Sequence, residues 1–162
     1  MKSQIKFLTA AVIASMAFAT ACNNNTDNPD DTTLKGEIPT GTTLTGNITA
    51  NATLTSGSSY KLSGGLHVKA GNTLTIEPGV TVVAVDDDAP DYILIEQGAK
   101  IDAQGTASNP IVMTSELKKS GAWGGIHICG RAHTNAGEGV LSEIGNAPYG
   151  GSDDSDNSGT LR

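Results

Sequence analysis

The sequence predicts an all-β fold in which short strands wind into a solenoid, a parallel β-helix. Three observations support this prediction: an internal repeat, turn residues at matching places in the repeat, and an aromatic content of only 4% in 162 residues. Short alternating strands between Gly, Asn or Pro-Gly turns are typical of β structure. A recurring unit of roughly 20 residues is typical of solenoids, in which each coil stacks on the next and buries a continuous core.

The repeat is clearest between residues 65–76 (GLHVKAGNTLTI) and residues 92–103 (YILIEQGAKIDA). When the two segments are aligned residue by residue, their apolar and turn positions coincide. This alignment pairs Leu66 with Ile93, Val68 with Ile95, Gly71 with Gly98, and Leu74 with Ile101. The alignment extends in both directions with other spacings, which pairs Ile48 with Val68, Leu54 with Leu74, Leu62 with Val82, and Ile126 and Ile128 with Ile93 and Ile95. A β-sandwich is the alternative, but it does not require equivalent residues at matching places.

The alignment predicts which side chains face the interior of the coils. These are Ile48, Leu54, Val68, Leu74, Val82, Ile95, Ile101, Val112 and Ile128. It also places Lys69 and Glu96 in one outward column on adjacent coils, where opposite charges stabilise each other. Because equivalent residues are unequally spaced, we expect loops at residues 85–92 and 104–110, and insertions at the corners of a solenoid often form its binding face.

The first 21 residues are predicted to be an export signal. Lys2 and Lys6 precede an apolar stretch that ends in small residues and is too short for a good transmembrane helix. Cys22, directly after Ala-Thr-Ala, resembles the lipobox of bacterial lipoproteins. This resemblance implies that Cys22 becomes the lipidated first residue of the mature protein, which then leaves Cys129 without a disulfide partner. The alternative is an ordinary secretory signal.

Residues 22–43 are predicted to be a flexible acidic tether, because they hold too few large apolar side chains to order themselves. The β-helix is predicted to cover residues 44–162. Removal of residues 1–21 leaves 8 basic and 17 acidic residues, a net charge of 8 − 17 = −9. So acidic a chain argues against nucleic acid as a partner, since that binding depends on basic residues that neutralise phosphates.

Four segments together resemble a known group of proteins. They are GNTLTIEPGVTVVA, AQGTASNPIVMTS, WGGIHICGRA and YGGSDDSDNSGTLR, in this order behind the lipobox. They are similar to the right-handed parallel β-helix lipoproteins of Bacteroidota, over residues 44–162. The resemblance implies a right-handed β-helix, a lipid anchor in the outer membrane, and a chain that is the N-terminal portion of a longer protein. It implies no particular chemistry. The acidic tether after Cys22 is compatible with display on the cell surface.

Residues 121–130 (GAWGGIHICG) combine a tryptophan, a histidine and a cysteine. Strand alternation turns His127 and Cys129 outward, and His67 in the same column lies two rungs away, about 9.6 Å. A transition-metal site needs three or four close ligands, so we interpret the segment as part of the wall. Gly124-Gly125 then allows the chain to bend, and Trp123 covers a corner.

Calcium is the only cofactor that the sequence suggests, at two acidic segments. Carboxylates that crowd together need either solvent or a hard cation such as Ca²⁺, which takes six to eight oxygen ligands. The candidate ligands are Asp86, Asp87, Asp88 and Asp91 in the first segment, and Asp154, Asp156 and Ser158 in the second. The alternatives are a solvated loop for the first and a polar turn for the second.

The predicted function is that of a lipid-anchored envelope protein that acts in binding or adhesion or as a structural scaffold, with polysaccharides or other envelope proteins as partners. The alternative is a polysaccharide lyase or glycoside hydrolase that uses a groove of the β-helix. The sequence leans against an enzyme, because no lysine or arginine falls in a recognisable lyase motif and no catalytic residue can be named. Aromatic side chains for sugar stacking are also few, with Trp123 and Tyr149 in the later coils.

Overall fold

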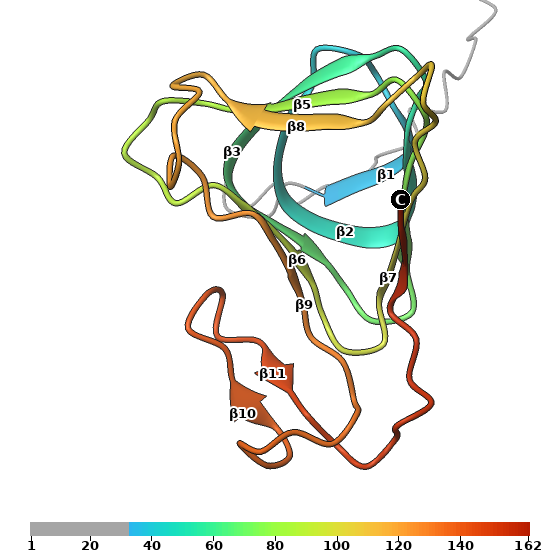
Figure 1. Cartoon of the computed structure of the whole chain (residues 1–162), viewed down its shortest axis with the longest axis vertical. Coiled ribbons are helices and arrows are strands. Elements are labelled where there is room, and N and C mark those ends of the chain that lie inside the picture. The colour runs from blue at the N-terminus through green and yellow to red at the C-terminus, as the bar shows by residue number, and fades with distance from the viewer. Residues whose placement is uncertain (1–32) are drawn as a thin grey trace, which may run out of the picture.

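The computed structural model describes residues 33–162, which form twelve strands and no helix. The strands wind into a three-sided coil (Figure 1). In chain order they are β1 Thr33–Ile38, β2 Thr43–Leu54, β3 Ser59–Val68, β4 Thr73–Ile76, β5 Thr81–Ala84, β6 Tyr92–Ile95, β7 Lys100–Ala103, β8 Val112–Ser115, β9 Ile126–Ile128, β10 Val140–Leu141, β11 Pro148–Tyr149 and β12 Gly159–Leu161.

Each side of the coil is a ladder of parallel strands. The β5–β8 face contains the start of β2, the start of β3, β5 and β8, and the β6–β9 face contains β1, β2, the end of β3, β6 and β9. The β7–β12 face contains β1, the end of β2, β4, β7 and β12. Parallel strands that stack coil upon coil form a β-helix, so the predicted fold class is confirmed.

The core is a set of apolar columns that run through the stacked coils. One column on the β6–β9 face is Leu34, Ile48, Val68, Ile95 and Ile128. Seven of the nine predicted inward residues are almost completely buried: Ile48, Leu54, Val68, Leu74, Val82, Ile95 and Ile101. Each such side chain contributes about 1.5–3 kcal/mol through the apolar surface that it removes from water.

Two of the nine predicted inward residues are exposed, and for Val112 the predicted direction is wrong. Val112 pairs with Thr81 on the outer side of β8 and is 43% exposed, whereas its neighbour Met113 pairs with the buried Val82. Ile128 pairs with Ile95 as predicted but is 45% exposed, because β9 is the outermost strand of its ladder.

The register also differs from the alignment at two places. Leu54 pairs with Ile76 instead of Leu74, and Leu62 pairs with Ala84 instead of Val82. The first shift arises at a corner, between the pairing of Ile48 with Val68 and that of Ala52 with Leu74. A shift by two positions returns each side chain to the same face, so both leucines remain in the core.

The β-helix begins earlier than predicted. β1 lies inside the segment predicted as a tether and pairs in parallel with β2, and its Ile38 is buried in the core. The signal peptide, Cys22 and residues 23–32 of the predicted tether lie outside the described residues. In residues 33–162, no helix is long and apolar enough to cross a membrane.

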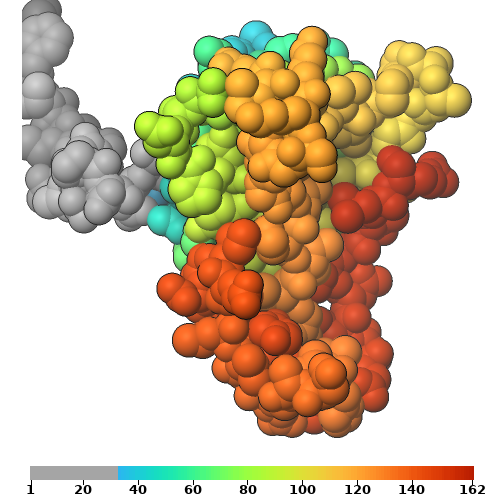
Figure 2. All heavy atoms as spheres, turned by 60° about the vertical axis from the view of Figure 1, so that its left-hand side comes forward, coloured from blue at the N-terminus to red at the C-terminus, as the bar shows by residue number. Residues whose placement is uncertain are grey.

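A segment between β9 and β12 departs from the coil. Ile93 pairs with Ile126 in β9, but Ile101 pairs with Gly159, which lies much farther along the chain. The extra residues contain the antiparallel hairpin of β10 and β11, which lies beside the coil stack, in orange and red in Figure 2. Leu94 and Cys129 on the outer side of the β6–β9 face are buried together with Ala147 of this hairpin.

Candidate functional site

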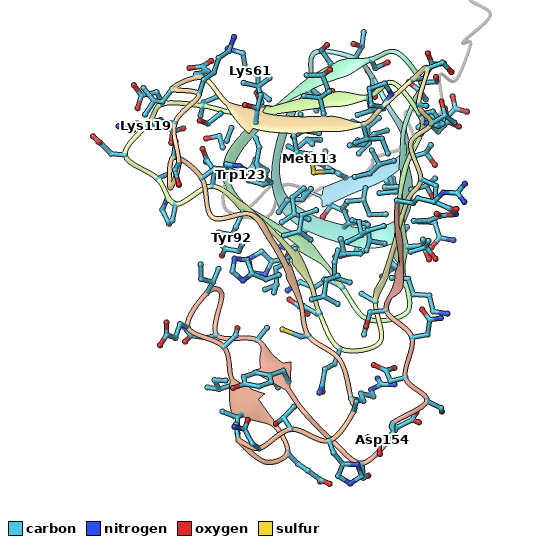
Figure 3. All side chains as sticks on the ribbon, in the orientation of Figure 1. Lys61, Tyr92, Met113, Lys119, Trp123 and Asp154 are labelled. Atoms are coloured by element: carbon cyan, nitrogen blue, oxygen red, sulfur yellow. The ribbon has the colours of Figure 1, made fainter. Side chains whose placement is uncertain are left out.

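The GAWGGIHICG segment forms a bend and strand β9, as its interpretation as wall requires. Trp123 packs against the core (Figure 3). The Gly124 amide donates a 2.6 Å hydrogen bond to the Asp91 carbonyl, and a Cβ at Gly124 would lie only 3.0 Å from that oxygen. Gly125 has a positive φ of 84°, which favours glycine. The glycine pair therefore allows the bend.

Cys129 faces away from the core but is only 3% exposed, because the hairpin covers it. Burial raises the pKa of the Cys129 thiol, a hydrogen bond with Ser142 opposes this shift, and the negative charge of Glu96 adds to it. A raised pKa keeps the thiol protonated at neutral pH, whereas nucleophilic catalysis needs the thiolate. This environment is that of a structural cysteine.

Four polar side chains form a hydrogen-bonded row on the β6–β9 face. Lys69 Nζ donates to Glu96 Oε1 over 2.6 Å, which confirms the predicted pair. His67 Nδ1 lies 3.3 Å from the same carboxylate oxygen, and His67 Nε2 lies 3.0 Å from the Tyr92 hydroxyl. Sequence reasoning did not identify Tyr92 as a member of this row.

The hairpin restricts access to this row. A Cβ at Gly145 would lie 2.7 Å from Leu94 Cδ2, 3.3 Å from His67 Cε1 and 3.4 Å from Tyr92 Oη, so the hairpin backbone rests on these side chains. The His67 side chain is 20% exposed and that of Glu96 is 24% exposed. In this arrangement the row joins adjacent coils and supports the hairpin.

The first acidic segment is anchored to the coil before it. Asp91 is 2% exposed, and its Oδ1 accepts a 2.6 Å hydrogen bond from the Gly64 amide. Burial raises the pKa of the Asp91 carboxyl, the bond from Gly64 lowers it, and the Asp87 charge raises it. Asp87 itself accepts a hydrogen bond from the Ser63 hydroxyl. Asp86 and Asp88 are exposed.

The second acidic segment binds the chain that follows β9. Asp154 Oδ1 accepts hydrogen bonds from the backbone amide and from Nδ1 of His133, and these bonds lower the pKa of the Asp154 carboxyl. Asp156 Oδ2 accepts one from the Arg131 amide, and the Ser158 carbonyl accepts one from the Ile101 amide. Within residues 33–162, no three His, Cys, Asp or Glu side chains are grouped to hold a metal ion, and calcium at either segment stays a prediction.

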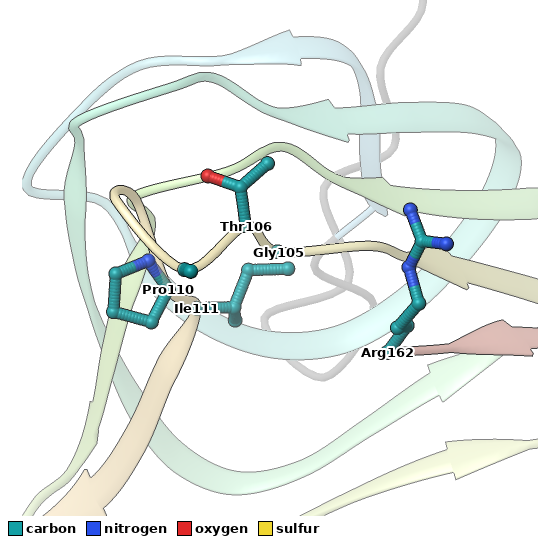
Figure 4. A pocket seen from close by; sticks show the side chains of 6 residues that line it. Gly105, Thr106, Pro110, Ile111 and Arg162 are labelled. Atoms are coloured by element: carbon teal, nitrogen blue, oxygen red, sulfur yellow. The ribbon is translucent and has the colours of Figure 1, made fainter.

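Several hollows lie on the surface of the coils. One of about 530 Å³ lies near the end of the chain (Figure 4), between the loop that carries Thr106, Pro110 and Ile111 and the last residue, Arg162. Another, of about 280 Å³, lies on the β5–β8 face beside Lys61 and Glu116.

A further hollow of about 280 Å³, on the β7–β12 face, is lined mainly by polar residues. It is called the polar hollow below, and its lining residues are Thr73, Lys100, Ile101, Asp102, Asn157, Gly159 and Thr160. Parallel pairing produces this arrangement, because Thr73 pairs with Lys100 and Asp102 pairs with Thr160. Neighbouring coils, about 4.8 Å apart, thus bring together residues that are far apart in the sequence. None of these residues was predicted as a ligand, although Asn157 and Gly159 lie within the second acidic segment.

Comparison with known proteins agrees with this architecture. A family model described as a pectate-lyase like β-helix domain matches residues 46–162, which is more than two thirds of the chain. No curated protein and no solved structure gives a significant match. The chain therefore belongs to the family of pectate-lyase like β-helix domains.

Proposed function

We propose that this protein is a lipid-anchored β-helix of the bacterial cell envelope that binds polysaccharide without cleaving it. The observation that carries the proposal is the polar hollow, which lies on the side of a pectate-lyase like β-helix. Binding sites for small polar ligands combine a concave surface with a few well-placed polar groups. The polar hollow has this character, with an ammonium group, a carboxylate, an amide and two hydroxyls along its wall.

The proposal favours binding over cleavage because of the hydrogen-bonded row on the β6–β9 face. Tyr92, His67 and Glu96 are the side chains in the described residues that most resemble a proton relay, and they bond to one another under the hairpin. A general base must reach the proton that it removes from a substrate. A covered row whose members are already paired fits a structural role better than acid–base chemistry.

The proposed anchor is the lipid on Cys22, and its support is the resemblance of the preceding residues to a lipobox. Cells that express the chain are grown with a labelled fatty acid, and the label is expected on the protein but not on the Cys22→Ser variant. Protease treatment of intact cells then tests surface display. Complete protection of the wild-type protein would contradict display on the outer face, and absence of the label would contradict the anchor.

Polysaccharide binding is tested on the purified mature chain, with neutral and acidic polysaccharides, in calcium and in EDTA. Retention is recorded by affinity electrophoresis, and product release is recorded by an assay for new reducing ends and for unsaturated sugars. We expect retention without products. Product release would replace this proposal with the lyase or hydrolase alternative, and absence of retention on every polysaccharide would refute it. Loss of retention in EDTA would support the predicted calcium sites.

A further inference from the structure

We infer that the polar hollow binds a neutral sugar unit through two adjacent hydroxyl groups. This inference rests on the proposed binding function and adds the ligand class and the contact residues. It follows from three features of the polar hollow: the kinds of hydrogen-bonding groups that line it, the way in which they are held, and their charge.

The lining groups match the needs of a pair of adjacent hydroxyls. Each sugar hydroxyl both donates and accepts a hydrogen bond, so a site for two of them needs acceptors and donors side by side. The ionised Asp102 carboxylate only accepts, the Lys100 ammonium only donates, and the hydroxyls of Thr73 and Thr160 do both. All four side chains line the same hollow. Hydrogen bonds to charged groups are the stronger kind, which gives Asp102 and Lys100 the largest expected effect.

Local hydrogen bonds orient two side chains of the polar hollow, Asp102 and Asn157, before any ligand binds. Gln104 Nε2 donates to Asp102 Oδ1 over 2.8 Å, which fixes the carboxylate and leaves its second oxygen to accept. Asn157 Oδ1 accepts a 2.8 Å hydrogen bond from the Gly159 amide, so the amide nitrogen of Asn157 remains to donate. Prior ordering of this kind lowers the entropy that binding costs.

Gly159 allows β12 to reach its place in the wall. A Cβ at this position would collide with the carbonyl oxygen of Ile101, the residue with which Gly159 pairs, and φ is 125°. Glycine therefore permits the close pairing of β12 with β7, and this pairing sets Thr160 beside Asp102.

Charge decides in favour of a neutral ligand. The polar hollow contains one cation and one anion, Lys100 and Asp102, so it offers no net attraction to a carboxylated sugar. The mature chain carries a formal net charge of 8 − 17 = −9, which repels anionic polymers at long range. An acidic polysaccharide should therefore bind more weakly than a neutral one.

The test compares variants of the polar hollow with matched variants elsewhere on the mature chain. Asp102→Asn and Lys100→Met each remove one charge from the polar hollow. Glu138→Gln before β10 and Lys119→Met after β8 each remove one charge of the same sign at exposed positions outside every predicted site. Affinity electrophoresis is run in gels with glucan, mannan or xylan as neutral polymers, and with polygalacturonate or alginate as acidic ones.

We expect a neutral polymer to retard the wild-type chain, and either variant of the polar hollow to weaken this binding about tenfold. The two control variants should bind within twofold of the wild type. Thermal unfolding of each variant excludes loss of fold, and Asn157→Ala serves as a second variant if Asp102→Asn lowers the unfolding temperature.

Three results would overturn the inference, and they differ in what they say of the proposed function. If the wild type is retained while the variants of the polar hollow bind equally well, the ligand site lies elsewhere and the proposed function stands. If acidic polymers are retained more strongly than neutral ones, the ligand class is wrong and the proposed function again stands. If no polymer retains the wild type, the proposed function and the inference both fail.

Discussion

The stacked core predicts that two isoleucines in one column differ sharply in their contribution to stability. Ile95 has a coil on both sides and is fully buried, whereas Ile128 in the adjacent rung is 45% exposed. Ile95→Ala leaves a cavity inside the column and should cost about 2–5 kcal/mol of the free energy of unfolding. Ile128→Ala removes the same three carbons from a site that buries little more than half of the side chain, a cost of about 1.3 kcal/mol.

Urea unfolding, followed by the fluorescence of the single tryptophan, Trp123, measures both costs. Ile95→Val is the control for the cavity, because it removes one carbon and should cost about 0.5–1.5 kcal/mol. The expected order is therefore Ile95→Ala above the other two variants. Equal costs for the two alanine variants, or a larger cost for Ile128→Ala, would refute the stacking order of β3, β6 and β9.

Three further predictions concern polar groups around the β6–β9 face. Lys69→Glu alone should lower the free energy of unfolding, and the double variant Lys69→Glu, Glu96→Lys should restore it. A double-mutant cycle should give a coupling energy of about 0.5–1 kcal/mol. Additive effects of the two single variants would contradict the Lys69–Glu96 ion pair. The pKa of the Asp91 carboxyl is higher in the folded than in the unfolded chain, so the folded state binds more protons. The free energy of unfolding should therefore fall as the pH rises above the ordinary pKa of 3.8. Urea unfolding of Asp91→Asn at a series of pH values above 3.8 should lack this fall. Iodoacetamide should alkylate Cys129 slowly in the native protein and faster in the Gly145→Ala variant, because the new Cβ displaces the hairpin from Leu94. The rates are measured by mass spectrometry. Equal rates would show that the hairpin does not cover the thiol.

The parts of the fold that were predictable are those in which one coil repeats the next. Val68 and Ile95, and Leu74 and Ile101, occupy equivalent places because parallel stacking sets like side chains above one another. The shift of Leu54 was not predictable, since a displacement by two positions keeps an apolar side chain on the same face. Val112 was misplaced because it lies in an apolar run with Ile111 and Met113 that gives no alternation to follow.

The hairpin left one signal in the sequence, in strand β6. Tyr92–Ile95 is apolar or aromatic at every position, whereas a strand with one face in water alternates. Leu94 points away from the core and is still fully buried, because the hairpin covers it. The hairpin on the outer side of β6 thus accounts for the continuous apolar run of this strand.

The polar hollow escaped sequence reasoning for a related reason. Its wall joins residues of successive coils, and the whole hairpin segment intervenes between β7 and its partner β12. The DDSDNSG turn, residues 153–159, ends this segment and contains the predicted calcium ligands Asp154, Asp156 and Ser158. Its carboxylates also accept hydrogen bonds from the Arg131 and His133 amides. These bonds hold the turn against the chain that follows β9, and Asn157 and β12 then return to the coil beside Asp102. Substitution of these acidic residues should therefore disturb the polar hollow even without a bound cation.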